Sequence, residues 1–173
     1  MPKIIKDLKP QIKQAAIELY ETIGYDKVSM RGIASKLGIA VGTLYNYYPN
    51  KDTLFLSSLE ESWLLTIDNI EQHISKSDDP EERLLLLVTT LYEDMIERKG
   101  LGKELFSKNS DHLDSMSHIF SKLQDLMIEL IHDYNPDGFE DRKALTLVMA
   151  IGHLIATFKD AKEKNIEYLM SIM

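Results

Sequence analysis

The residues with the most chemistry to offer lie in one short run, from Gly42 to Lys51. This run supplies hydroxyl, amide and ammonium groups together with aromatic faces, carried by Thr43, Tyr45, Asn46, Tyr47 and Lys51. It contains no carboxylate, histidine or cysteine that could act as a general base or nucleophile. Groups of these kinds form hydrogen bonds, ring contacts and ion pairs, so the run predicts binding to an anionic surface and not a reaction.

Three helices must position this run. A first helix is predicted to open near Asp7–Pro10 and to end at Gly24, which we expect to provide a left-handed stop. Ser29 is a good N-cap for a second helix over 30–37, which Gly38 ends. A third helix is predicted over 41–47, where Leu44 and Tyr48 are expected to pack inward. Pro49 cannot continue it, and Asn50 caps a long fourth helix.

Two short helices joined by a glycine-containing turn, behind a scaffold helix, match the helix-turn-helix layout. In that layout the second short helix enters the major groove of DNA while the first crosses the backbone. Gly42 would let backbone and DNA approach closely, and Lys51 could pair with a phosphate. We therefore predict a DNA-binding domain over residues 1–52, with the helix-turn-helix motif at about 29–48.

Residues 12–55 resemble the head of the TetR family of transcriptional regulators. The residues that carry the resemblance are Ala15, Ala16, Gly24, Ile33, Ala34, Gly38, Ile39, Gly42, Thr43, Leu44, Tyr45, Tyr47, Tyr48, Asn50 and Lys51. The resemblance implies homodimers that repress by covering a palindromic operator in double-stranded DNA, and a variable helical domain that releases DNA on binding a small-molecule effector. It also implies base-edge contacts from Arg31 and from the helix that starts at Val41, and phosphate contacts from Thr43, Tyr45, Tyr47 and Lys51.

The full set of expected DNA contacts is Ser29, Arg31, Val41, Gly42, Thr43, Tyr45, Asn46, Tyr47 and Lys51. One position departs from the family pattern: many relatives cap the recognition helix with Ser or Thr, and here the residue is Ala40. Loss of a cap costs about 0.5–2 kcal/mol, so we expect this helix to be fully ordered only on DNA. Val41 offers no hydrogen bond, and an apolar contact with a thymine methyl is its expected contribution.

The rest of the chain, residues 53–173, is predicted to be a helical ligand-binding and dimerisation domain. Helical periodicity runs almost throughout, so the fold class is all-α with about nine helices. Apolar positions three to four apart mark the fourth helix as far as Ile74. The remaining helices are expected from Pro80 to a stop at Gly100-Leu101-Gly102, near 103–107, and over about 114–134, 139–160 and 162–172.

Large apolar side chains in this domain are the candidates for lining a ligand pocket. They are Trp63, Tyr92, Phe120, Met127 and Met149. We expect a predominantly apolar cavity bordered by the fourth, fifth, seventh and eighth helices.

The eighth helix is apolar on more than one face, which exceeds what a single core-facing stripe requires. With the ninth helix it predicts a two-fold dimer closed by a four-helix bundle. The expected interface residues are Val148, Gly152, Ile155, Ala156 and Leu169.

The charge is divided unevenly along the chain. The net charge of −8 comes from a head, residues 1–52, with eight Lys/Arg against five Asp/Glu, and from a strongly acidic remainder. A phosphate backbone attracts the first part and repels the second, which fits a DNA-facing head on an acidic body.

Other kinds of site receive no support from the sequence. The chain has no cysteine, its five histidines lack metal-ligand spacing, and no catalytic grouping or phosphate-binding loop occurs. No catalytic residue, metal or cofactor is therefore expected, and the one anticipated ligand is the unidentified effector. No stretch resembles a leader or a membrane span, so a cytoplasmic protein is predicted.

Two other classes of function stay open from the sequence alone. One is a helical interaction or adaptor protein whose head no longer binds DNA, and the other is a small all-α enzyme. Steeply salt-dependent DNA binding would separate the regulator from the adaptor.

Overall fold

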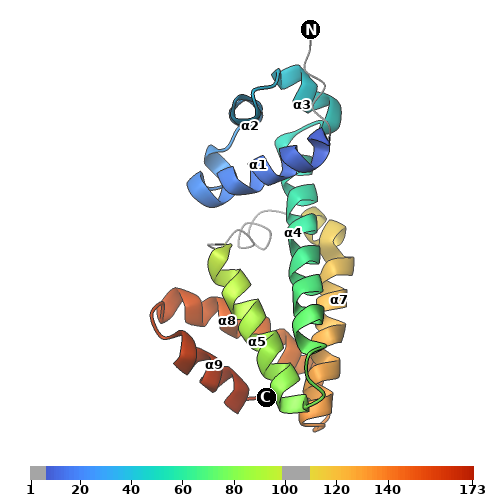
Figure 1. Cartoon of the computed structure of the whole chain (residues 1–173), viewed down its shortest axis with the longest axis vertical. Helices are drawn as coiled ribbons and strands as arrows, with labels where there is room; N and C mark the ends of the chain where they lie inside the picture. Colours follow the sequence, from blue (N-terminus) through green and yellow to red (C-terminus); the bar gives the residue numbers. More distant parts are fainter. Residues whose placement is uncertain (1–6, 99–109) are drawn as a thin grey trace. The chain divides into compact units, whose positions relative to one another are not determined.

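The computed structural model describes the backbone of residues 7–98 and 110–173, and these ranges are helical without any strand (Figure 1). The helices are α1 (Leu8–Ile23), α2 (Met30–Leu37), α3 (Val41–Tyr47), α4 (Lys51–Ile74), α5 (Pro80–Glu97), α7 (Ser110–Tyr134), α8 (Glu140–Thr157) and α9 (Lys162–Ser171), with a 3-10 turn η1 (Tyr25–Lys27). The all-α prediction is confirmed. About nine helices were expected and the described ranges hold eight α-helices, while the helix expected near 103–107 and the stop at 100–102 lie outside them.

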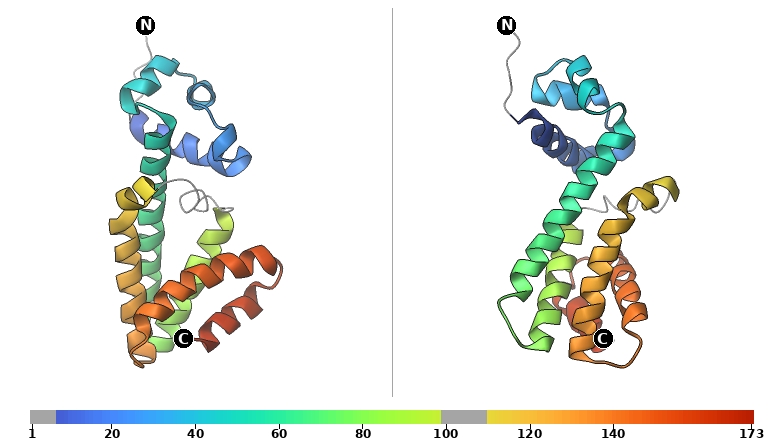
Figure 2. Two further views of the ribbon diagram at one scale, coloured as in Figure 1. Left: turned by 180° about the vertical axis from the view of Figure 1, so that it is seen from behind. Right: turned by 90° about the vertical axis from the view of Figure 1, so that its right-hand side faces the viewer.

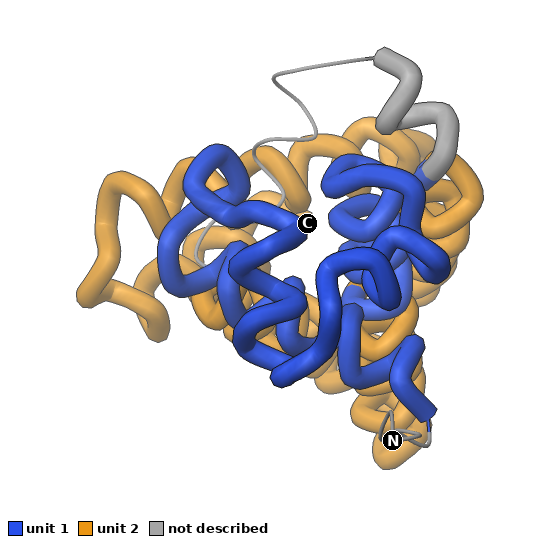
Figure 3. The backbone as a smooth tube through the Cα atoms, turned by 90° about the horizontal axis from the view of Figure 1, so that it is seen from above, with its two compact units in different colours: residues 1–62, 101–116 blue, residues 63–100, 117–173 orange. Residues whose placement is uncertain are grey.

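The chain folds into two compact units (Figure 3). The first contains the described residues up to Ser62 and the start of α7 as far as Met116. The second contains the described residues from Trp63 to Arg98 and from Ser117 onward. Helix α4 begins in the first unit and ends in the second. The predicted division after residue 52 falls in the first turn of α4, and as a functional boundary it stays a prediction.

In the first unit, α2 packs against both α1 and α3 (Figure 1). Its core consists of apolar residues that recur three to four apart along the helices. The fully buried ones include Ile12, Ala16, Ile33, Leu44, Leu54 and Leu59. Helix α1 ends at Gly24 as predicted, but the conformation differs from the expected left-handed stop. Gly24 has φ +80° and ψ 153°, an extended region that only glycine enters readily.

In the second unit, α5 packs against α8 and α9, and the three helices lie together in every view (Figures 1 and 2). Helix α7 contacts α4 through the Trp63 and Phe120 rings and through an ion pair between Lys122 and Glu71 at 3.0 Å. The start of α5 follows its sequence signal, because Asp79 Oδ1 accepts from the backbone N–H of Glu81 at 2.8 Å.

Helix α8 is shorter than the predicted 139–160 and ends at Thr157. The carbonyl of Phe158 accepts from the side chain of Asn165 at 3.1 Å and from the backbone N–H of Ala161 at 3.2 Å. These two donors satisfy the carbonyl outside the helix, so the chain turns there into α9. None of the described helices combines the length and the hydropathy that crossing a bilayer requires.

Candidate nucleic-acid interface

Local hydrogen bonds fix the start and the end of α2. Ser29 Oγ accepts from the backbone N–H of Gly32 at 3.1 Å, which is the predicted N-cap. Gly38 ends the helix with φ +65° and ψ 32°, a left-handed conformation that glycine adopts without strain. The next N–H, of Ile39, closes the turn on the carbonyl of Ala34 at 3.0 Å. Both sequence signals are therefore confirmed, and together they determine where α3 begins.

Helix α3 is anchored by two residues and exposes most of the others. Leu44 and Tyr48 are buried, as expected. Tyr45 is 50% exposed and Tyr47 44% exposed, and at 100° per residue they lie on opposite sides of the buried strip. Asn46 and Gly42 are also exposed, whereas Val41 and Thr43 are half-buried.

The predicted contact residues outside α3 differ in how they are held. Arg31 is exposed on α2 and, within the described part of the chain, has no acidic partner at ion-pair distance. Ser29 is exposed too, but its oxygen already serves as the helix cap. Lys51 is half-buried, and its Nζ donates to the backbone carbonyl of Tyr25 at 3.0 Å.

Tyr25 is the residue that sequence reasoning missed. Its ring lies 4.0 Å from Lys51 Nζ, and its hydroxyl donates to Asp52. The ring belongs to an aromatic cluster in which Phe55 lies 4.7 Å and Tyr20 5.8 Å away, centroid to centroid. Burial raises the pKa of the Tyr20 hydroxyl above its usual value, so Tyr20 stays uncharged at neutral pH.

Two other lysines of the first unit are engaged with acids of the chain itself. Lys36 pairs with Glu18 at 2.8 Å, and Lys13 pairs with Glu61 at 2.6 Å. The hydrogen bond from Lys36 lowers the pKa of Glu18 below its usual value, so the Glu18 carboxylate is ionised at neutral pH. The positive charge of the head is therefore less available to DNA than the count of residues suggests. Exposed Arg31 becomes a more important candidate for DNA contact.

In the second unit the structure brings together two of the five predicted pocket residues. Trp63 and Phe120 meet edge to face at 6.1 Å, and the Arg98 guanidinium lies 4.5 Å from the Trp63 ring. Tyr92 is buried and accepts from Asn165 of α9 at 2.8 Å. Met127 is buried as well.

Met149 does not face the interior, because it is 69% exposed on the side of α8 opposite to buried Leu147 and Ile151. The apolar spacing of α8 suits either side of the helix, which is why its sequence alone suggested an inward position.

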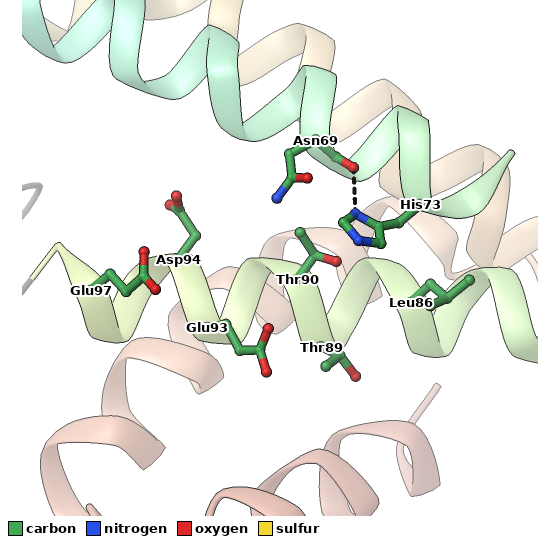
Figure 4. A pocket seen from close by; sticks show the side chains of 8 residues that line it. All are labelled: Asn69, His73, Leu86, Thr89, Thr90, Glu93, Asp94 and Glu97. Carbon is green, nitrogen blue, oxygen red and sulfur yellow. Dashed lines mark hydrogen bonds between the residues drawn. The ribbon is translucent and has the colours of Figure 1, made fainter. Parts of the chain in front are cut away.

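A groove of about 300 Å³ lies between α4 and α5 in the second unit (Figure 4). It is lined by Asn69, His73, Leu86, Thr89, Thr90, Glu93, Asp94 and Glu97. His73 Nδ1 lies 2.8 Å from the carbonyl of Asn69, and Asp94 accepts from Thr66 at 2.8 Å. This polar, acidic groove contains none of the predicted pocket residues, and it is not the apolar cavity that the sequence suggested.

The predicted dimer residues differ in how exposed they are in the single chain. Ala156 is exposed, while Val148, Gly152 and Ile155 are half-buried. A Cβ on Gly152 would lie 3.5 Å from Met95 Cε, so this glycine faces α5 of its own chain.

Leu169 is fully buried within its own unit, and its place at an interface with a second copy stays a prediction. Its side of α9 is the one that packs on α5 and α8. The apolar residues that do remain exposed on α8 and α9 include Leu145, Met149 and Tyr168.

Comparison with known proteins agrees with this geometry. Residues 12–57 match the sequence model of bacterial regulatory proteins of the tetR family. The HTH-type transcriptional regulator YuxN of Bacillus subtilis is 32% identical over 95 residues, which cover 55% of this chain and 33% of YuxN. The HTH-type transcriptional repressor KstR of Rhodococcus jostii is 41% identical over 54 residues, which cover 31% of this chain and 26% of KstR. The chain thus matches only about a third or less of the length of these relatives.

Among solved structures, the transcriptional regulator FadR of Bacillus subtilis, determined in complex with stearoyl-CoA, has the same fold. The TM-score is 0.76 at 19% sequence identity, and the match covers 95% of this chain and 98% of FadR. The likeness therefore extends over both units, far beyond the 46 or so residues of the matched head, and at this identity it concerns the fold alone.

The uncapped start of α3 generates a prediction. Ala40 has φ −68° and ψ 140°, the extended conformation of an N-cap, but its methyl group accepts no hydrogen bond. Ala40→Ser should supply the acceptor and raise the free energy of unfolding by about 0.5–2 kcal/mol, measured by urea titration with circular dichroism. Ala40→Val, which adds bulk without an acceptor, is the matched control. Equal stability of the two variants would contradict the missing cap.

Proposed function

We propose that this chain, a member of the TetR family of bacterial regulatory proteins, is a homodimeric transcriptional repressor that a small-molecule ligand releases from a palindromic operator. The observation that supports the proposal is the exposure of most side chains of α3. Leu44 and Tyr48 anchor this seven-residue helix, while Tyr45, Asn46 and Tyr47 stay in solvent. The chain itself therefore leaves hydroxyl, amide and aromatic groups of one short helix uncovered and available to a binding partner.

In the proposed complex α3 lies in the major groove and α2 crosses the backbone. Arg31 reads a base edge, and Val41 contacts a thymine methyl. Gly42 permits close approach of the backbone, and Asn46 offers an amide to a base edge or a phosphate. Phosphates are bound by Thr43, Tyr45, Tyr47 and Lys51, and Ser29 at the start of α2 is a further DNA contact. KstR, a relative matched over the head, is named a repressor, which supports repression rather than activation.

Dimerisation is proposed because a single small head buries too little surface for specific binding. Leu145, Met149 and Ala156 recur along α8 at helical spacing and are exposed in the single chain. Tyr168 on α9 is 53% exposed as well. We propose that these surfaces of two copies form a four-helix bundle, with the recognition helices about 34–36 Å apart, one turn of DNA.

Release by a ligand is proposed from the surroundings of Trp63. Its indole Nε1 is buried and has no hydrogen-bond partner among the described residues, whereas buried donors are nearly always paired. An acceptor atom on an apolar ligand would pair it, with the Phe120 ring as an apolar neighbour 6.1 Å away, centroid to centroid. FadR, which has the same fold, was solved with stearoyl-CoA, and this supports a long-chain acyl compound as the first probe.

The DNA-binding proposal predicts a steep dependence of affinity on salt. Fluorescence anisotropy against fragments of the source genome should give one tight fragment, with a linear loss of log affinity as log salt increases. Arg31→Ala should reduce the difference in binding free energy between this fragment and bulk DNA by about 1–3 kcal/mol. Arg142→Ala removes the same charge from an exposed position in the second unit and should change nothing. Binding that is absent or insensitive to salt would reject the regulator and favour an adaptor.

The dimer proposal predicts that Ala156→Arg produces a monomer. Wild type should sediment at twice its chain mass of 19.9 kDa, whereas two facing arginines would repel each other in the bundle. Thr146→Arg is the control, because Thr146 is exposed on another side of the same helix. Gly152→Arg is unsuitable, since Gly152 faces Met95 of its own chain and a long side chain there would disturb this packing. A monomeric wild type, or an Ala156→Arg variant that stays dimeric, would exclude this interface.

The ligand proposal predicts a fluorescence response, because Trp63 is the one tryptophan of the chain. Titration with acyl-CoA esters of increasing chain length should shift its emission and lower DNA affinity, more strongly for longer chains. Trp63→Phe should weaken the response of DNA affinity, since it keeps a ring but removes the N–H donor. If no chain length changes either signal, acyl compounds are not the effector class.

A further inference from the structure

Tyr25 contacts two consecutive residues of opposite charge at the start of α4. Its backbone carbonyl accepts from Lys51 Nζ at 3.0 Å, and the same nitrogen lies 4.0 Å from the centre of its ring. Its hydroxyl donates to Asp52 Oδ1. One tyrosine in a 3-10 turn therefore holds both an ammonium and a carboxylate that lie 26 and 27 residues further along the chain.

We propose that Tyr25 is a positioning residue for DNA binding: it holds the Lys51 ammonium ready for a backbone phosphate and keeps the Asp52 carboxylate occupied. This inference rests on the proposed function, because it assumes that Lys51 binds a phosphate. It assigns to Tyr25 a part in recognition although this residue lies outside the helix-turn-helix motif.

The geometry leaves Lys51 able to bind. An ammonium has three N–H donors, and the carbonyl of Tyr25 takes one of them. The ring attracts the ammonium electrostatically through its face, so N–H donors of Lys51 remain for a phosphate. A long lysine side chain would otherwise lose rotamer freedom when it binds a phosphate, and here part of that freedom is already lost in the unbound protein.

Asp52 explains why the hydroxyl of Tyr25 matters. An acid in the first turn of a helix is favourable for the helix dipole, but beside Lys51 it also repels a phosphate. The hydrogen bond from Tyr25 offsets part of this negative charge. The chain thereby keeps the acid that favours the helix and reduces its cost to DNA binding.

The ring of Tyr25 is itself fixed by neighbours that do not depend on Lys51. Phe55 lies 4.7 Å away, and Phe55 packs edge-on against buried Tyr20 at 4.9 Å. Gly24, with φ +80°, directs the chain into the turn that carries Tyr25. Tyr25 can therefore act as a platform that stays in place when Lys51 is exchanged.

A double-mutant cycle in the full chain tests the inference, with a short random-sequence duplex as the probe and anisotropy measured over a range of salt. Lys51→Ala should lower the salt slope by about one. Tyr25→Leu should weaken binding by about two- to fivefold, the size of an exposed cation–π contact. The loss caused by Tyr25→Leu should be smaller in the Lys51→Ala background than in wild type, because most of the effect of Tyr25 acts through Lys51 and only the part that acts through Asp52 remains. A merely structural role would instead give the same loss in both backgrounds, and that result would overturn the inference.

A second pair of variants isolates the hydroxyl and keeps the test decisive if Tyr25→Leu melts early. Tyr25→Phe retains the ring and the carbonyl and frees Asp52. Asp52→Asn should then gain more affinity in the Tyr25→Phe background than in wild type, and equal gains would overturn the part assigned to the hydroxyl. If wild type itself shows no salt-dependent binding, the proposed function fails and this inference with it. If wild type binds and the cycles are additive, the inference alone fails.

Discussion

The burial of Leu44 and Tyr48 is the interaction on which the candidate interface depends. Helix α3 has seven residues, too few to be stable alone in water, and it lacks a side-chain N-cap. Its order comes from these two side chains and from the turn at Gly38. Because so little of α3 is used for packing, most of its surface stays free for another molecule. The helix is therefore sensitive to the loss of its two buried side chains, and truncation of Leu44 to alanine should disorder α3.

Electrostatics in the first unit follow from pairs within the chain more than from net charge. Lys13 and Lys36 have carboxylate partners at 2.6 and 2.8 Å, and DNA must compete with those partners for them. The exposed Lys36–Glu18 pair contributes about 0–1 kcal/mol, so at Lys36 this competition is mild. Lys51 is held differently, by a carbonyl and a ring, neither of which carries a charge. A phosphate can therefore approach Lys51 without displacing an anion.

The sequence predicted what local rules govern. Ser29, Gly38, Asn50 and Asp79 cap or end helices through bonds to residues within four positions, and each has the predicted role. Tyr25 escaped prediction because a 3-10 turn has no apolar period and its partners lie far along the chain. The environments of Met149, which is exposed, and Leu169, which is buried, differ from the expected ones for a related reason. Apolar spacing identifies the faces of α8 and α9 that avoid water, but not which of them the chain's own helices cover.

If the proposed ligand and operator both bind, their effects on each other must be equal in free energy. A ligand that lowers operator affinity tenfold must itself bind tenfold more weakly to the operator complex, whatever the structural route between the sites. Helix α4 carries the residues proposed for both contacts, Lys51 at its first residue and Trp63 three turns later, in different compact units. Tight binding at Trp63 does not by itself release DNA, because only a difference in ligand affinity between the free and the DNA-bound protein shifts the equilibrium. A ligand that merely fills space beside Trp63 equally well in both states would stabilise the fold and leave the operator occupied.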